Sequence, residues 1–238
     1  METTKEKVAR ALAARVQDGE IIGLGSGSTV ELAVERIGER IAKEGLRVTG
    51  MPSSQRIARV AADAGITVIS PFVDLRPAWG FDGADEVDPL LNLIKGRGGA
   101  MLPEKILAKK VTKFVIIVSE DKLVSVLGSK FPVPVEIIPE SLSIVKEQLL
   151  AMGASEIVVR ESSGKYGPVI TEHGNIILDV RFESLKATFE KEIKGIVGVV
   201  ESGLFCGYSP EVIIAGADRV LSRTLDAKGK VAEKPLFL

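Results

Sequence analysis

A glycine-rich stretch, Gly23-Leu24-Gly25-Ser26-Gly27-Ser28-Thr29, separates an apolar run from an amphipathic one. Ile21 and Ile22 before it indicate a short buried strand, and the apolar positions of residues 29–43 recur near the 3.6-residue period of a helix. Glycines at such a joint let backbone N–H groups approach an anion, and the helix N-terminus adds the positive end of a dipole. The stretch therefore predicts a βα unit with a phosphate site, and the question is which phosphate.

Three kinds of phosphate ligand can be compared with this stretch. A dinucleotide loop needs G-x-G-x-x-G and a carboxylate about 20 residues further on, whereas here the next strand ends in Val48-Thr49-Gly50. A nucleoside triphosphate loop ends in Gly-Lys-Ser/Thr, and this one has no lysine. The N–H groups and hydroxyls that remain suit a terminal monophosphate. The structural alternative is a tight turn with Ser28 or Thr29 as helix N-cap, and the loop alone does not decide between the two.

The composition narrows the class of partner. The 238 residues suffice for one large domain or two modest ones, and 31 Lys and Arg nearly balance 32 Asp and Glu, so we expect a small-molecule partner and no nucleic acid. One cysteine, Cys206, and one histidine, His173, exclude a disulfide framework and a structural zinc site. No run approaches 18 apolar residues and the N-terminus lacks a continuous apolar segment. We expect a soluble, cytoplasmic protein without a membrane partner.

Strands and helices alternate through the first half of the chain. Strands are predicted at residues 20–23, 46–50, 67–69, 79–81 and 113–118, with helices at 3–17, 29–43, 53–64 and 104–111. This alternation predicts the α/β class, with a Rossmann-like, mostly parallel sheet and helices on both faces.

The order of predicted strands and helices changes after Phe131-Pro132-Val133-Pro134. Strands at 135–138, 156–160, 169–171, 176–180 and 196–201 and helices at 142–152 and 185–194 resemble a βαββαβ sandwich, in which a turn at 172–175 joins two of the strands into a hairpin. This order predicts a smaller, ferredoxin-like α+β domain over residues 132–205. The apolar run Val212–Gly216 predicts a strand that returns to the first sheet, so residues 1–131 and 206–238 would form the larger α/β domain and 132–205 an insertion.

A second motif, Phe81-Asp82-Gly83-Ala84-Asp85-Glu86-Val87-Asp88, places four acids just past a predicted strand. Carboxylates repel phosphate but bind sugar hydroxyls, so a ligand with a phosphate at one end and hydroxyls at the other would satisfy both motifs. We expect Glu86 and Asp88 to cap a solvated turn. A Mg²⁺ site is the weaker hypothesis, because no nucleotide loop accompanies the acids.

A third motif, residues 95–105, reads KGRGGAMLPEK. Its glycines let backbone pass close to a ligand, Lys95 adds positive charge, and Pro103 fits the first turn of a helix that contains Glu104. A glutamate at a helix start by itself only complements the dipole. With a phosphate loop, paired acids and a lysine at strand ends, the combination favours acid–base chemistry on a sugar phosphate.

Together with Phe131-Pro132-Val133-Pro134-Val135-Glu136, the three motifs resemble the type A ribose-5-phosphate isomerase family over essentially the whole chain. The resemblance implies interconversion of ribose 5-phosphate and ribulose 5-phosphate in the non-oxidative pentose phosphate pathway, without metal or organic cofactor, by a homodimer or homotetramer. The residues that it places at the substrate are Ser26, Gly27, Ser28, Thr29, Asp82, Gly83, Ala84, Asp85, Lys95, Gly96, Arg97, Gly98 and Lys122.

The resemblance also implies catalytic roles. Glu104 is the base that moves a proton between C1 and C2 through an enediolate, and Lys95 supplies positive charge where the oxyanion forms. Asp82 and Asp85 bind hydroxyls and assist opening of the furanose ring. Lys5 matches an N-terminal lysine of the family only loosely.

Two residues depart from the family pattern, and two other classes of protein resemble the same fold. Arg97 replaces a glycine and Pro103 replaces the usual residue before the glutamate. Coenzyme A transferases, which use a glutamate as nucleophile, and regulators that bind phosphosugars without turning them over resemble the same fold. A transferase would form a covalent glutamyl thioester, and a sensor would bind without turnover.

Overall fold

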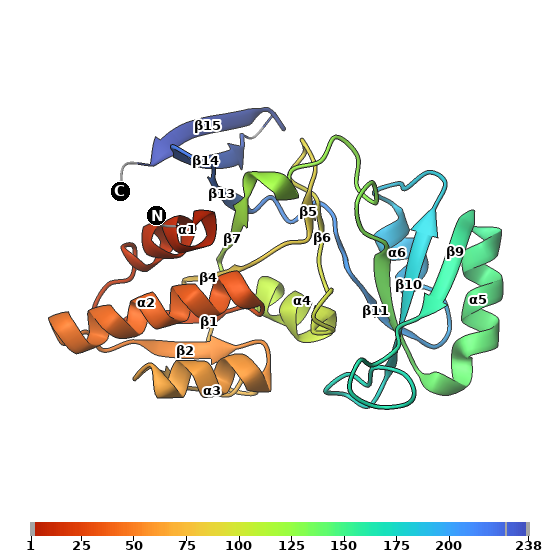
Figure 1. The fold of residues 1–238 in the computed structure, drawn as a ribbon, viewed down its shortest axis with the longest axis horizontal. Helices are drawn as coiled ribbons and strands as arrows, with labels where there is room; N and C mark the ends of the chain where they lie inside the picture. Colours follow the sequence, from red (N-terminus) through yellow and green to blue (C-terminus); the bar gives the residue numbers. More distant parts are fainter. Residues whose placement is uncertain (1–2, 227, 237–238) are drawn as a thin grey trace. The chain divides into compact units, whose positions relative to one another are not determined.

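The computed structural model describes residues 3–226 and 228–236, which form two compact units (Figure 1). The first takes its residues from Met1–Ala84, Pro103–Lys122 and Tyr208–Leu238, and the second from Asp85–Leu102 and Leu123–Gly207. The predicted insertion, 132–205, falls inside the second unit.

The first unit is built on an eight-stranded sheet with the spatial order β15-β14-β13-β7-β4-β1-β2-β3. Its strands are β1 (Ile21–Leu24), β2 (Thr49–Pro52), β3 (Thr67–Val68), β4 (Trp79–Asp82), β7 (Lys113–Ser119), β13 (Glu211–Ala215), β14 (Val220–Leu225) and β15 (Val231–Leu236). Strands β1 to β4, β7 and β13 pair in parallel, whereas β14 and β15 are antiparallel. The predicted α/β class with a mostly parallel sheet is confirmed. The last two strands, at one edge of the unit in Figure 1, were not predicted.

Helices cover both faces of this sheet. Strand residues Ile22, Leu24 and Phe81 point to the face packed by α1 (Thr4–Ala13), α2 (Ser28–Glu44) and α3 (Gln55–Asp63). Because side chains alternate along a strand, Gly23 and Gly80 face the other way. A Cβ at Gly23 would lie 2.9 Å from Leu107 and from Val111, so α4 (Met101–Lys110) covers the second face.

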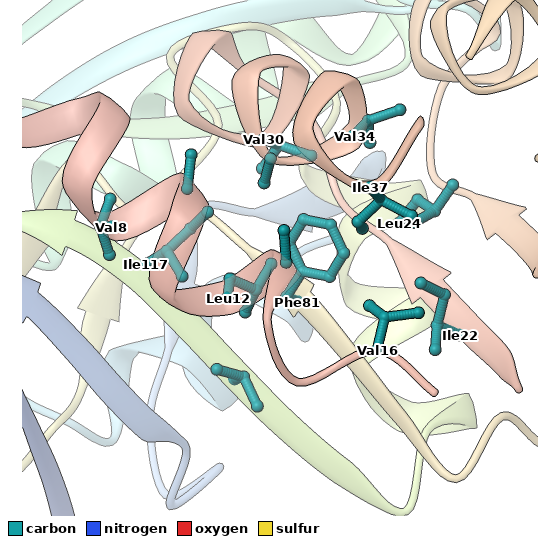
Figure 2. Close-up of a cluster of buried hydrophobic side chains, with 14 of the residues drawn as sticks. Val8, Leu12, Val16, Ile22, Leu24, Val30, Val34, Ile37, Phe81 and Ile117 are labelled. Atoms are coloured by element: carbon teal, nitrogen blue, oxygen red, sulfur yellow. The ribbon is translucent and has the colours of Figure 1, made fainter. Parts of the chain in front are cut away.

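The core on the first face is continuous and apolar. Figure 2 shows Phe81 from the sheet among Leu12 of α1 and Val30, Val34 and Ile37 of α2. These side chains are fully buried, and burying an aliphatic or aromatic side chain of this size is worth about 1.5–3 kcal/mol. This core anchors the strands whose ends carry the predicted site.

The second unit contains a four-stranded antiparallel sheet with the order β11-β8-β10-β9. Its elements, in chain order, are β8 (Val133–Ile137), α5 (Leu142–Ala151), β9 (Ala154–Val159), β10 (Ile176–Phe182), α6 (Phe189–Lys194) and β11 (Val199–Ser202). The chain order βαββαβ with the first strand beside the fourth and third is the predicted ferredoxin-like arrangement. The apolar residues of α5 and α6 pack on one face of this sheet.

A small sheet completes the second unit. It consists of β5 (Glu86–Val87), β6 (Leu93–Ile94) and β12 (Leu204–Phe205) in the order β12-β6-β5. These pairings explain why residues 85–102 belong to this unit.

Several predicted element bounds were wrong. The strand predicted at 46–50 lies at Thr49–Pro52, because Arg47 N–H donates to the Asp18 carboxylate instead of a neighbouring strand. The first helix ends at Ala13 and not at residue 17. After its end, the Arg40 side chain donates hydrogen bonds to the carbonyls of Ala13 and Val16. The strand predicted at 169–171 is reduced to one bridge between Ile170 and Ile176.

Two further bounds differ, both in the second unit. The helix predicted at 185–194 begins at Phe189, after a turn closed by the Phe189 N–H and the Lys186 carbonyl. The strand predicted at 196–201 begins at Val199, because Val199 N–H first closes a turn onto Ile196. Among residues 3–226 and 228–236, no helix combines the length and apolarity needed to span a membrane.

Candidate active site

The strand order of the first unit reverses between β1 and β4. From β1 the chain runs outward through β2 to β3, and it then returns to place β4 on the other side of β1. In open parallel sheets, the carboxyl ends of the two strands at such a reversal leave room for a ligand. The predicted phosphate loop follows β1, and Asp82 is the last residue of β4.

Asp82 and the phosphate loop are joined directly. The Asp82 Oδ1 atom accepts hydrogen bonds from Ser26 N–H at 3.0 Å and from Gly83 N–H at 2.7 Å, and Gly25 N–H donates to the Phe81 carbonyl at 2.8 Å. A Cβ at Gly25 would lie 2.1 Å from Asp82 Cγ, so only glycine fits there. The fully buried Asp82 is thus fixed by the loop.

The N-terminus of α2 lacks a side-chain cap. Its N-cap is Gly27, with φ of 112°, and no side chain caps it, so the alternative with Ser28 or Thr29 as N-cap is wrong. Within the described part of the chain, the N–H groups of Ser28, Thr29 and Val30 have no acceptor. Three such N–H groups at the positive end of a 17-residue helix are the kind of groups with which helix N-termini bind anions.

Lys5, which matches the family pattern only loosely, and two serines that the sequence did not place at the site also lie at this loop. The ammonium of Lys5, on α1, is 3.0 Å from Ser28 Oγ. Ser26 Oγ lies 2.9 Å from both Ser53 Oγ and Ser54 Oγ, just after β2. Ser53 and Ser54 could have been found from their position directly after β2, the strand that pairs with β1. That inference requires the strand order, which the sequence does not give.

Glu104 and Lys122 also lie at the carboxyl edge of the large sheet. Helix α4 leads from the carboxyl end of β4 to the amino end of β7, so its first turn, which contains Glu104, lies at the carboxyl edge. Glu104 is 4% exposed. Lys122 ends a 3₁₀ turn, Glu120–Lys122, directly after β7. Pro103 falls in the first turn of α4, where a missing N–H breaks no helical hydrogen bond.

Of the remaining predicted residues, Ala84 belongs to the first unit and the others belong to the second. Asp85 N–H donates to the Ile94 carbonyl, and its Oδ2 atom accepts from Arg97 N–H at 3.1 Å. Lys95 is 2% exposed, and its ammonium lies 5.6 Å from the centre of the Phe205 ring. Gly96 and Gly99 have positive φ and form a turn closed by the Gly99 N–H and the Gly96 carbonyl. The exposed Arg97 side chain stacks on Phe131 at 5.0 Å.

The other two acids of the second motif have structural partners, one of them unexpected. Asp88 caps its turn as predicted, accepting from the N–H groups of Leu90 and Asn92 at 2.8 Å. Glu86 does not cap a solvated turn, because it is fully buried. Its carboxylate instead accepts three backbone N–H groups of the chain segment 128–131, at 2.6–2.7 Å.

The predicted residues therefore fall into two groups. In the first unit the structure brings Asp82 together with Ser26 and Gly83 and places Glu104 and Lys122 at the same sheet edge. In the second it joins Asp85 to the glycine-rich lysine loop. No group of three or more His, Cys, Asp or Glu side chains among the described residues is arranged to hold a metal ion.

A family comparison covers most of the chain. The family model of ribose 5-phosphate isomerase A (phosphoriboisomerase A) matches residues 49–219. The chain belongs to the ribose 5-phosphate isomerase A family. A relative of that name from Methanothermobacter thermautotrophicus is 43% identical over 219 residues, 91% of this chain and 95% of the relative. One from Archaeoglobus fulgidus is also 43% identical over 219 residues, which cover 90% and 96% of the two chains.

Solved structures agree with this membership. Ribose 5-phosphate isomerase A from Methanocaldococcus jannaschii superposes with a TM-score of 0.88 at 40% identity, over 97% of this chain and 98% of the other. A D-ribose-5-phosphate isomerase in complex with phospho-erythronic acid gives a TM-score of 0.87 at 34% identity, over 98% and 97%. The likeness extends over both units of the ribose 5-phosphate isomerase A fold.

Proposed function

We propose that this protein interconverts D-ribose 5-phosphate and D-ribulose 5-phosphate. The observation that carries the proposal is the N-terminus of α2, where three N–H groups without an acceptor in the described chain lie beside the Lys5 ammonium and Asp82. A helix N-terminus and a cation bind phosphate, and a buried carboxylate next to them binds a sugar hydroxyl. This combination suits a small phosphosugar.

Glu104 is the base in the proposed mechanism. It takes the proton from C2 of the open-chain aldose, the C1–C2 enediolate forms, and the same carboxyl returns the proton to C1 to give the ketose. The hydroxyl proton moves between the oxygens of C1 and C2, so no other atom is gained or lost. Lys95 stabilises the enediolate oxygen, and Asp82 and Asp85 bind hydroxyls and assist ring opening.

The same proposal assigns the substrate contacts. They are Ser26, Gly27, Ser28, Thr29, Asp82, Gly83, Ala84, Asp85, Lys95, Gly96, Arg97, Gly98 and Lys122. The open N–H groups of α2 support Ser28 and Thr29, because these two N–H groups would otherwise lack acceptors.

The test is the appearance of ketose after ribose 5-phosphate is added to metal-stripped protein. We expect turnover that persists in EDTA, because the acids of the second motif are assigned to hydroxyls. Activity that disappears and returns with Mg²⁺ would refute the metal-free mechanism. Binding of phospho-erythronic acid, whose carboxylate resembles an enediolate, should be measurable by calorimetry and should compete with ribose 5-phosphate.

Two alternatives give different results in that test. A coenzyme A transferase would gain mass on incubation with an acyl-coenzyme A, through a thioester on a glutamate. A phosphosugar sensor would bind ribose 5-phosphate and produce no ketose. Either result would replace the isomerase assignment.

Assembly and location are further parts of the proposal. We expect a homodimer or homotetramer, so light scattering at micromolar concentration should give a multiple of 25.4 kDa, and a value of 25.4 kDa would contradict it. A cytoplasmic location stays a prediction, based on the single cysteine of the chain.

A further inference from the structure

The second unit fixes the glycine-rich lysine loop, residues 95–99, with a side chain from a distant strand. Arg160 follows β9, and one of its terminal nitrogens, Nη1, donates to the carbonyl oxygens of Gly96 and Arg97, each at 2.9 Å. Arg160 is separated from these two residues by more than 60 positions along the chain.

The Arg160 side chain is held in turn by Asp179. Its Nε atom donates to Asp179 Oδ2 at 2.9 Å and its Nη2 atom to Asp179 Oδ1, a bidentate pair. Both side chains are mostly buried, at 16% and 23% exposure. The planar guanidinium can bind a carboxylate along one edge while the remaining N–H groups point elsewhere, which a lysine ammonium cannot reproduce.

The strand pattern of the small sheet places the pair on the face opposite its helices. Asp179 lies on β10 between Leu178 and Val180, which pack with the apolar core under α5 and α6. It therefore points to the other face, where a cavity of about 370 Å³ is also lined by Asp85, Arg97 and Phe131. The ion pair and the loop thus line the same cavity within one unit.

The carbonyls of Gly96 and Arg97 belong to two consecutive peptide groups, and the N–H groups of these two peptides differ in their hydrogen bonding. The Gly96–Arg97 peptide donates its N–H to Asp85 Oδ2. The next peptide presents the N–H of Gly98, which has no acceptor within the described residues. Because a peptide group is planar, holding its carbonyl also fixes the direction of its N–H. Arg160 therefore orients both the donor to Asp85 and the open donor at Gly98.

We propose that Arg160, held by Asp179, is a positioning residue that aims the lysine loop at the substrate. The proposal rests on the proposed isomerase function for its kinetic consequence, since Asp85 and residues 95–98 act there on the sugar. It also makes a claim about the loop alone, which does not depend on turnover.

A matched control exists on the same two strands. Arg181 of β10 and Glu156 of β9 form an ion pair at 3.4 Å, and within the described chain no hydrogen bond joins either side chain to residues 95–99. Replacing Arg181 with Gln removes one ion pair from the sheet and leaves the loop contacts in place. Arg181→Gln therefore measures how the loss of an ion pair between β9 and β10 affects activity while the contacts of residues 95–99 remain.

The kinetic test compares Arg160→Gln, Arg160→Lys and Arg181→Gln in ribose 5-phosphate isomerisation. We expect kcat to fall roughly 30- to 100-fold in Arg160→Gln, the size of effect that a misplacement of about 1 Å produces, while KM changes less than about three-fold. Arg160→Lys should recover only part of kcat, because an ammonium cannot serve the carboxylate and both carbonyls together. Arg181→Gln should stay within about two-fold of wild type.

The second readout is amide hydrogen exchange of a peptide covering residues 94–101. It should quicken in Arg160→Gln and stay unchanged in Arg181→Gln. If Arg160→Gln does not fold, Asp179→Asn keeps the packing and should show the same kcat and exchange changes in weaker form. Equal kcat and equal exchange in Arg160→Gln and Arg181→Gln would overturn the proposal. If the wild-type protein makes no ketose, the proposed function fails, and the exchange comparison alone decides the positioning claim.

Discussion

The two glycine-rich loops of this protein are fixed in different ways. The loop at residues 23–29 is held by its own strand and helix and by Asp82 at the end of the adjacent strand. The loop at residues 95–99 is held through its carbonyls by Arg160, whose partner is Asp179. A loop between a strand and a helix of the large sheet can thus be held by that sheet, whereas the loop between the two-residue strand β6 and helix α4 is held by side chains from elsewhere in the fold.

Gly25→Ala should have the largest effect of the substitutions that test this comparison. A Cβ at residue 25 would meet Asp82 Cγ at 2.1 Å, so the loop and the carboxylate must separate. We expect kcat/KM for ribose 5-phosphate to fall at least about 100-fold, since displacements of this size disturb both binding and orientation.

Gly98→Ala is the control in the second loop. A Cβ there would meet no heavy atom within 4 Å of the described structure. Its kcat/KM should stay within about five-fold of wild type. Equal losses in both variants would mean that the first loop is not the more tightly constrained one.

Acid should weaken the framework of the first unit through Glu211. This carboxylate is bound by Arg15, Lys113 and Ser222. Burial alone would raise its pKa, but these donors outweigh burial and lower the pKa to about 2. A carboxyl with a lowered pKa stabilises the folded state above its unfolded-state pKa of about 4.5, and this contribution is lost as the pH falls toward 2.

The corresponding measurement is urea unfolding of wild type and Glu211→Gln at two pH values. The deficit of the variant should be on the order of 3 kcal/mol at pH 6 and should shrink to about 1 kcal/mol at pH 3. A deficit that does not change with pH would show that the charge of Glu211 contributes nothing to this framework.

Glu86 is the counterpart of Glu211 in the second unit, but its donors are backbone N–H groups. Glu86→Gln removes the charge and leaves one of three N–H donors facing an amide NH₂ group. We expect a loss of about 2 kcal/mol in the free energy of unfolding, because a buried donor loses its acceptor. Asp88→Asn, in a more exposed turn, should cost less than about 1 kcal/mol. A larger loss in Asp88→Asn would reverse the roles assigned to the two acids.

Of the two substitutions in the first loop, Thr29→Ala should have the smaller effect. The hydroxyl is one of several donors at the α2 N-terminus, and the N–H groups remain, so KM for ribose 5-phosphate should rise by the equivalent of about 1 kcal/mol, or roughly five-fold, with kcat unchanged. A fall in kcat at unchanged KM would place Thr29 at the reacting carbons and not at the phosphate.

The sequence predicted those features whose causes are local. The βα joint was predicted because its glycines, the strand before it and the helix after it are contiguous. The burial of Glu86 was missed, since the segment 128–131 that covers it lies about 40 residues away. Ser53 and Ser54 were missed because only the pairing of β2 with β1 brings them to Ser26.

The contact between Arg160 and Asp179 in the second unit was also missed because the two residues are distant in the sequence. Arg160 and Asp179 carry no motif, and their role depends on two antiparallel strands meeting in one register. The hairpin of β14 and β15 was missed because its residues do not alternate clearly between apolar and polar. Strand pairing, and not local propensity, decides these features.

Glu104→Gln is the decisive test of Glu104 as the base of an isomerase. The substitution keeps the shape of the side chain and removes its basicity. General-base catalysis is worth roughly 10²–10⁴-fold, so kcat should fall by that factor while phospho-erythronic acid still binds within a few-fold of wild type. In D₂O, wild-type turnover should place deuterium at C1 or C2, and the variant should place none. Near-normal turnover with continued deuterium uptake in Glu104→Gln would contradict the account and make Asp82 or Asp85 the base.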